Sequence, residues 1–183
     1  MPGNLSDFFP EAVRYTTCRG IAAMVIIVMG VTAAGKTTVG QALAAELRWK
    51  FVDADSYHSV ANVAKMHAGI ALSDADREPW LNSLHNAISG WLAANENVVL
   101  ACSALKETYR RRLLMAPQVK LIYLRASRQL VAARLAERKN HYMNPSLIDS
   151  QFATLEEPLD AVTVDASLPT EQIVTKIRQA LRL

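Results

Sequence analysis

The sequence predicts an α/β fold, a three-layer sandwich in which a five-stranded parallel sheet lies between two layers of helices. Two observations lead to this prediction. Short apolar segments alternate with longer segments of helical periodicity, which is the pattern of β-α-β units. A glycine-containing loop also follows the first apolar segment and precedes a helical one, as phosphate-binding turns do. We therefore expect one domain over residues 24–183, with ligands at the carboxyl ends of the strands.

The composition is that of a compact globular protein. Of the 183 residues, 51% are apolar and 20% are charged, which excludes disordered, collagen-like and low-complexity classes. Cys18 and Cys102 stand far apart and form neither a disulfide framework nor a zinc pattern, so we expect a cytoplasmic protein. The net charge of +3 is spread along the chain and suits an anionic small substrate. Because aromatic residues do not interleave with the basic ones, nucleic acid is not an expected partner.

Five apolar segments are expected to form the strands. The first lies in the apolar run Ile21–Met29, whose nine residues fall short of the roughly 20 that cross a membrane. Residues 1–23 are expected to form a loose extension, and Met24 suggests a shorter natural start. The expected strands are Met24–Met29, Lys50–Asp53, Asn97–Ala101, Lys120–Leu124 and Ala161–Val164.

The clearest helix is expected from about Asp76 to Ala94, where apolar residues recur at helical spacing. This spacing favours a core position for Trp80 and Trp91 over contact with a ligand. Asp74 or Asp76 is placed to cap the helix.

The loop Gly30-Val-Thr-Ala-Ala-Gly-Lys-Thr37 satisfies the phosphate-binding pattern G-x-x-x-x-G-K-[ST]. An apolar strand precedes it and a predicted helix, Thr37–Leu47, follows, which disfavours a chance match. Glycines let backbone N–H groups turn toward phosphate oxygens, Lys36 is suited to the β and γ phosphates, and Thr37 is suited to Mg²⁺. The expected nucleotide contacts are Gly30, Val31, Thr32, Ala33, Ala34, Gly35, Lys36, Thr37 and Thr38.

Two carboxylates follow the second predicted strand. Asp53 and Asp55 share one side of the chain if the strand persists, and at that edge of the sheet they face the γ-phosphate and its acceptor. The alternative is helix capping, with Asp55 or Ser56 starting the helix that contains Val60. No guanine-reading Asn-Lys-x-Asp segment is present, and the third strand leads into Cys102 in place of an acidic residue, which disfavours GTPases and motor ATPases.

A basic cluster lies further along the chain. Arg134 and Arg138 are four residues apart and share one helix face within a predicted helical lid over about residues 125–145. Positive side chains over a transferring phosphoryl group stabilise its spread charge. The alternative is an ordinary solvated basic face.

These motifs together resemble the gluconokinases, P-loop kinases akin to shikimate and nucleoside monophosphate kinases. The resemblance runs from Met24 onward. Besides the phosphate loop it rests on an ordered series of segments. They are Phe51-Val-Asp-Ala-Asp-Ser-Tyr-His58, Ala61–Met66 with Gly69–Leu72, Asp74-Ala-Asp-Arg-Glu-Pro-Trp-Leu81, Cys102-Ser-Ala-Leu-Lys106 with Tyr109-Arg110, Arg134-Leu with Arg138–His141, and Gln151-Phe-Ala-Thr-Leu-Glu-Glu-Pro158. It implies ATP-dependent phosphorylation of the C6 hydroxyl of D-gluconate, with ATP and Mg²⁺ as cofactors and a homodimeric assembly.

The resemblance also implies roles for individual residues. Lys36, Asp55, Arg134 and Arg138 would serve catalysis, and Thr37 and Asp53 the Mg²⁺ ion. Gluconate would be bound by Asp55, His58, Arg77, Lys106, Arg110 and His141, several of which are equally suited to be surface residues or helix caps.

The chain departs from the usual family pattern at several positions. Ala33 and Ala34 replace a glycine and a serine of the phosphate loop, while Ala54, Ser59 and Asn140 replace a glycine, a proline and a glycine. No charged group is lost, but the acceptor preference is less firmly implied than the reaction type. A related kinase with another acceptor and a nucleotide-binding regulatory module remain alternatives.

Overall fold

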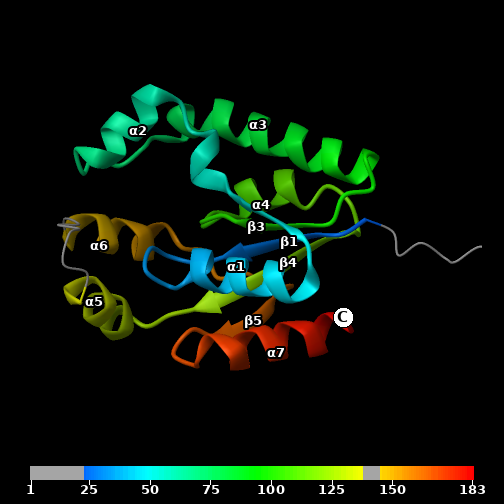
Figure 1. The fold of residues 1–183 in the computed structure, drawn as a ribbon. Helices are drawn as coiled ribbons and strands as arrows, with labels where there is room; N and C mark the ends of the chain where they lie inside the picture. Colours follow the sequence, from blue (N-terminus) through cyan, green and yellow to red (C-terminus); the bar gives the residue numbers. More distant parts are fainter. Residues whose placement is uncertain (1–22, 138–144) are drawn as a thin grey trace, which may run out of the picture.

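The computed structural model describes residues 23–137 and 145–183, and within these ranges it contains one five-stranded parallel sheet (Figure 1). The spatial order is β2-β3-β1-β4-β5. The strands are β1 (Val25–Met29), β2 (Lys50–Asp53), β3 (Val98–Ala101), β4 (Val119–Arg125) and β5 (Val162–Asp165). Each predicted strand is confirmed, and no predicted strand end lies more than one residue from the observed end.

The helices cover both faces of this sheet (Figure 1). They are α1 (Lys36–Leu47), α2 (Val60–His67), α3 (Asp74–Ala93), α4 (Glu107–Leu113), α5 (Arg128–Ala136), α6 (Pro145–Thr154) and α7 (Thr170–Leu181), with a short 3₁₀ helix η1 at Ala54–Tyr57. In Figure 1, α3 and α4 lie above the sheet and α7 below it, and α1 packs into the same core as α7, which confirms the three-layer arrangement. None of the helices in the described ranges combines the length and apolar character of a bilayer-spanning segment.

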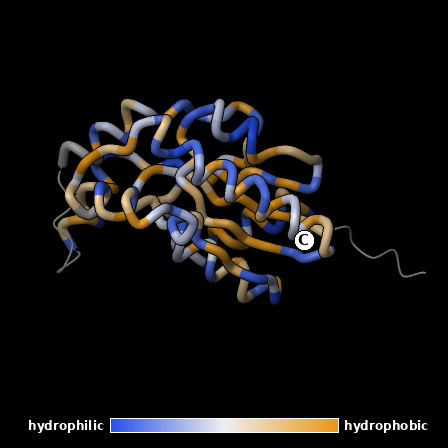
Figure 2. Tube along the Cα trace, turned by 90° about the horizontal axis from the view of Figure 1, so that it is seen from above, coloured by the Kyte–Doolittle hydropathy of each residue, from blue (hydrophilic) through white to orange (hydrophobic). Residues whose placement is uncertain are grey.

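The central strand β1 sends alternate side chains into two cores. Ile26 and Val28 pack with residues of α1 and α7, whereas Val25, Ile27 and Met29 pack with residues of α3 and α4. All five side chains are fully buried. A strand buried on both faces is expected to be continuously apolar, as this one is. Figure 2 shows the same pattern as apolar strands at the centre, surrounded by helices of mixed hydropathy.

The predicted core role of the α3 tryptophans is confirmed, since Trp80 and Trp91 are buried. Of the two predicted caps of α3, Asp76 takes part in the cap, but the N-cap itself is a residue that was not predicted. Ser73 is the N-cap and accepts a hydrogen bond from the Asp76 amide, while the Asp76 carboxylate accepts one from the Ser73 amide in return. This reciprocal capping box satisfies two end groups of the helix, which a single acidic cap cannot do.

The start of α2 also differs from the prediction. Ser59, and neither Asp55 nor Ser56, caps this helix by accepting from the Asn62 amide at 3.2 Å. Asp53 instead caps η1, where its carboxylate accepts from the Asp55 amide. Because η1 lies between β2 and α2, the helix begins several residues later than expected.

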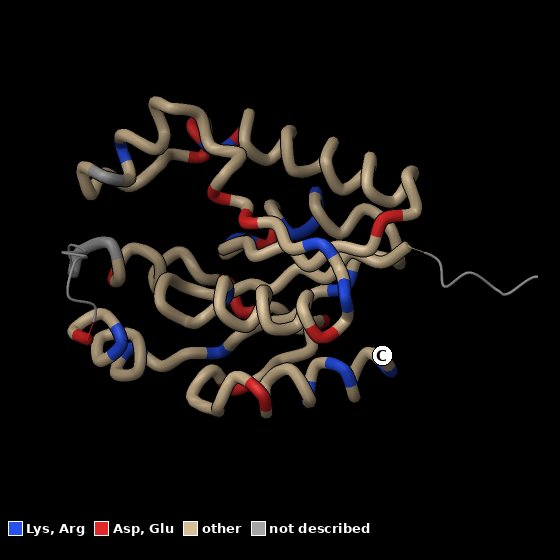
Figure 3. Tube along the Cα trace, in the orientation of Figure 1, with Lys and Arg blue, Asp and Glu red and all other residues tan. Residues whose placement is uncertain are grey.

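The carboxyl ends of the strands gather on one side of the molecule, at the left of Figure 1, near α2, α5 and α6. The register aligns Val28 of β1 with Ala101 of β3, and Ala101 with Asp53 of β2. Figure 3 shows few charged positions on the strands and charges of both signs on the helices and loops. The side chains that follow β1, β2 and β3 are therefore brought to one edge.

We predict that Leu84→Ala destabilises the protein by about 2–5 kcal/mol, because this fully buried α3 side chain leaves a cavity in the core. Asn86→Ala, at an exposed position of the same helix, should change the free energy of unfolding by less than about 0.5 kcal/mol. Urea unfolding of both variants measures the difference, and equal effects would contradict the described packing of α3.

Candidate active site

The phosphate loop joins β1 to α1 and takes its shape from two glycines. Gly30 has φ +150°, and a Cβ there would lie 2.8 Å from the carbonyl oxygen of Leu124. Gly35, the N-cap of α1, is left-handed with φ +101°. Helix α1 begins at the next residue, Lys36, so its first N–H groups have no partner within the helix and point toward the loop. Such a helix start favours anionic ligands.

Ala33 also has a left-handed backbone, with φ +55°. An L-residue in this region is less stable than glycine by roughly 1–2 kcal/mol. The methyl group is buried in the core, which offsets part of that cost. The loop keeps its conformation even though an alanine stands where the family pattern has a glycine.

Thr37 and Asp53 meet across two neighbouring segments. The Thr37 hydroxyl donates to Oδ2 of Asp53 at 3.0 Å, which links the start of α1 to the end of β2. Both side chains offer hard oxygen atoms beside the phosphate loop, the ligand type that Mg²⁺ takes in phosphoryl-transfer sites. The predicted Mg²⁺ residues are thus brought together.

Asp55 lies just beyond this pair. Its carboxyl group is solvent-accessible, yet the protein around it desolvates it and, together with the charge of Asp53, raises its pKa above the ordinary value. The charges of Lys36 and His58 act in the opposite direction. Charged groups of the phosphate loop, of the end of β2 and of the η1–α2 junction therefore all act on the Asp55 carboxyl group.

His58 is held flat against Trp80, with ring centroids 4.7 Å apart and an interplanar angle of 7°. The Trp80 ring is fixed in turn, since its Nε1 donates to the Ala54 carbonyl at 2.8 Å. Desolvation lowers the pKa of His58, an effect that Arg77 reinforces and Asp55 opposes. His58 is therefore favoured in its neutral form, able to donate and accept hydrogen bonds.

Lys106 and Arg77 converge on Asp74. The Lys106 ammonium lies 2.7 Å from each Asp74 carboxylate oxygen, and the Tyr109 hydroxyl donates to the same carboxylate. Arg77 donates to the Leu72 carbonyl at 2.6 Å, with its guanidinium 3.9 Å from Asp74. Two of the predicted substrate residues thus share one carboxylate that the sequence analysis assigned only to helix capping.

Arg110 has a different environment from the other predicted substrate residues. It is 5% exposed, and its guanidinium donates to the carbonyls of Ala104 and Leu105. Desolvation lowers its pKa from the usual value. These contacts favour a role in shaping the loop that carries Lys106.

Cys102, directly after β3, is buried beside the site. Burial raises the pKa of its thiol to about 12. The thiol is therefore protonated at neutral pH and is not a nucleophile.

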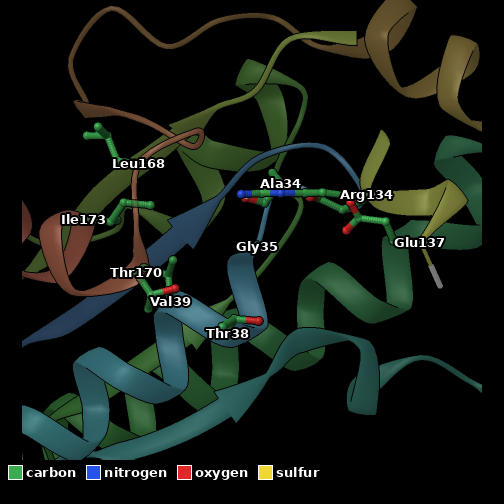
Figure 4. A pocket seen from close by; sticks show the side chains of 10 residues that line it. Ala34, Gly35, Thr38, Val39, Arg134, Glu137, Leu168, Thr170 and Ile173 are labelled. Atoms are coloured by element: carbon green, nitrogen blue, oxygen red, sulfur yellow. The ribbon is translucent and has the colours of Figure 1, made fainter. Parts of the chain in front are cut away.

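A cavity of about 440 Å³ adjoins the phosphate loop (Figure 4). Arg134 of α5 reaches across it and donates to the carbonyls of Ala33 and Ala34 at 3.2 and 2.9 Å, and to that of Ala166 at 2.7 Å. The cavity is open between the loop and the β5–α7 connection. Its lining consists of Ala33, Ala34, Gly35, Thr38, Val39, Arg134, Glu137, Leu168, Thr170 and Ile173.

The predicted lid is described only in part. Helix α5 lies within it and α6 begins where it ends, while Arg138 and His141 lie outside the described residues. The expected extension also lies outside them, apart from Ala23. The sequence analysis missed two contributions to the site, the β5–α7 connection at the cavity and Gln151, whose side chain accepts from the Thr32 amide at 2.7 Å.

A phosphate loop at the end of the central strand of this parallel sheet, with an acidic pair at the end of a nearby strand, is the arrangement of the P-loop kinases that act on small molecules. Comparison with known proteins agrees. The family described as shikimate kinase matches residues 32–182. A solved gluconokinase from Sinorhizobium meliloti 1021 is 37% identical with a TM-score of 0.79, and the match covers 88% of this chain and 93% of that one.

Sequence relatives place the chain more closely. It is 43% identical to the probable gluconokinase of Mus musculus, over 86% of this chain and 97% of the relative. It is 38% identical to the thermosensitive gluconokinase of Escherichia coli K12, over 85% of this chain and 86% of the relative. The chain therefore belongs to the gluconokinase family, within the wider group that includes shikimate kinases.

Asp76 provides a prediction on the pH dependence of stability. Hydrogen bonds from Lys65 and Ser73 lower its pKa to about 2. Because the pKa of the unfolded chain is higher, the stability that Asp76 contributes is present above about pH 4 and is lost as the pH falls toward 2. Asp76→Asn should therefore lose less stability than the wild type over this interval. Denaturant unfolding at several pH values measures it, and parallel curves would contradict the assignment.

Proposed function

We propose that this protein transfers the γ-phosphoryl group of ATP to the C6 hydroxyl of D-gluconate, giving 6-phosphogluconate and ADP. The observation that carries the proposal is the Thr37–Asp53 contact, which brings the phosphate loop against the acidic segment after β2. The names of the relatives, gluconokinases at 38–43% identity over most of the chain, support gluconate as the acceptor.

Nucleotide binding is proposed for the loop from Gly30 to Thr38 and the cavity beside it. Backbone N–H groups at the start of α1 meet the phosphates, and Lys36 bridges the β and γ phosphates. The 440 Å³ cavity is within the size range of small-molecule sites and receives the nucleoside. Arg134, which lines it, holds the loop and meets the charge of the phosphates.

The residues beside the loop fit a magnesium ion, with Thr37 and Asp53 as the groups that hold it or its water shell. When bound, the ion neutralises charge on the phosphates during transfer.

The acceptor side of the site is proposed to run from Asp55 to Lys106. Asp55 accepts a hydrogen bond from the C6 hydroxyl and orients its oxygen toward the γ-phosphorus. The oxygen forms a bond to that phosphorus, the bond to the bridging oxygen of ADP breaks, and the hydroxyl proton leaves to Asp55 or to water. Neutral His58 suits the substrate hydroxyls.

The gluconate carboxylate needs positive partners, which Arg77 and Lys106 supply. Their shared partner Asp74 keeps both cations near the site before substrate arrives.

Arg138 and His141 stay proposed contributors to substrate binding from the lid, and Arg110 is proposed to contribute through the loop before α4. A cytoplasmic location and a homodimer also remain predictions, and light scattering of the purified protein tests the latter.

A steady-state assay of ADP release with Mg²⁺ and ATP tests the proposed reaction. Gluconate should stimulate the release strongly, and shikimate, other sugar acids and nucleoside monophosphates should not. Lys36→Ala should lower turnover at least about a hundredfold, because a preorganised charge on the phosphates is lost. Turnover with another acceptor alone would redirect the proposal to a related kinase, and no dependence on any acceptor would favour a regulatory nucleotide-binding module.

Asp55→Asn tests the acceptor role. We expect kcat to fall by about 10²–10⁴, the range for a lost acid–base group. In the wild type, activity should fall on the acid side at a pH above that of an ordinary aspartate, because the pKa of Asp55 is raised and only the ionised form accepts the hydroxyl proton. Asp160→Asn, at an exposed position, is the matched control. Near-normal turnover in Asp55→Asn would remove it from this role.

A further inference from the structure

One peptide unit of the phosphate loop, between Val31 and Thr32, is held from both ends. Its carbonyl oxygen accepts from the Lys36 ammonium at 3.0 Å. Its N–H donates to Oε1 of Gln151 at 2.7 Å. The C=O and N–H groups of a planar trans peptide point in opposite directions, so the two bonds together fix a single orientation of the plane.

Gln151 reaches the loop from α6, 119 residues away in the sequence. The segment that follows it is anchored at three points. The Glu156 amide donates to the Leu105 carbonyl at 3.0 Å, and the Glu156 carboxylate accepts from the Glu107 amide at the start of α4. The Glu157 carboxylate accepts from Tyr123 and Arg125 at the end of β4.

These contacts give α6 a fixed place at the carboxyl edge of the sheet. Because the segment directly after α6 is tied to β4, to the start of α4 and to the loop before it, the half-buried Gln151 side chain is presented from a supported position. A side chain held this way keeps a neighbouring site in a defined geometry.

We propose that Gln151 is a positioning residue for phosphoryl transfer, acting through the Val31–Thr32 peptide on Lys36. By accepting from Thr32, it turns the Val31 carbonyl toward the Lys36 ammonium and so sets where that charge stands before ATP binds. The inference rests on the proposed function, and it assigns Gln151 no contact with substrate. Misplacement of a charged group by about 1 Å is enough to slow phosphoryl transfer strongly.

A neutral acceptor suits this position better than a charged one. A glutamate would accept from the same N–H group, but its negative charge beside the phosphate loop would oppose the phosphates of ATP. A methionine has nearly the same length and no comparable acceptor. Gln151→Met and Gln151→Glu therefore separate the hydrogen bond from the shape of the side chain.

The test compares both variants with Gln179→Met, a matched change at an exposed position of α7. Gln151→Met should lower kcat about tenfold while the KM for gluconate stays within about twofold and the Tm matches that of the control. Gln151→Glu should recover most of kcat and raise the KM for ATP. Wild-type kcat in Gln151→Met, or equal losses of kcat in both variants, would overturn the proposal.

Amide exchange at Thr32, followed by NMR on the full chain without substrate, gives a readout independent of activity. It should be slow in the wild type and in Gln151→Glu, and at least about tenfold faster in Gln151→Met. An unchanged rate in Gln151→Met would show that Gln151 does not hold the peptide and would overturn the proposal. Failure of the wild type to phosphorylate gluconate would instead count against the proposed function, which this exchange rate does not measure.

Discussion

The hydrogen bond from Thr37 to Asp53, 3.0 Å long, joins the two halves of the site. Thr37 lies in the first turn of α1, and Asp53 ends β2, which lies two strands away from β1 in the sheet. The contact depends on the parallel register that brings the ends of β1, β3 and β2 to one edge. Asp53 also caps η1 and so directs the chain toward Asp55 and His58. One carboxylate thereby links the start of α1 to the segment that carries Asp55 and His58.

The phosphate loop is supported from outside as well as by its own glycines. Arg134 holds the carbonyls of Ala33 and Ala34, and Gln151 holds the amide of Thr32. These partners come from α5 and α6, two helices far from the loop in the sequence. They explain how the loop keeps its shape although Ala33 occupies a left-handed conformation that favours glycine. The substitution places strain in the loop, and contacts from distant segments hold the loop against it.

Patterns in the sequence predicted the strands, the phosphate loop and the buried tryptophans. They also predicted that Thr37 and Asp53 lie at the same edge of the sheet. The caps were harder, because serine and aspartate compete at the same helix start and only the backbone decides between Ser73 and Asp76. The pairing of Lys106 with Asp74 and the reach of Gln151 to Thr32 depend on packing between distant segments, which no local period encodes. Family resemblance supplied what spacing alone left open, the identity of the acceptor.

Product analysis by NMR tests the central claim, transfer to a hydroxyl of gluconate oriented at the end of β2, most directly. Uniformly ¹³C-labelled gluconate is incubated with ATP, Mg²⁺ and the full chain, and the phosphorus couplings of the product are measured. The account predicts one phosphate monoester, coupled to C6, formed in equal amount with ADP. Release of inorganic phosphate with gluconate unchanged, or a phosphate on another carbon, would contradict it.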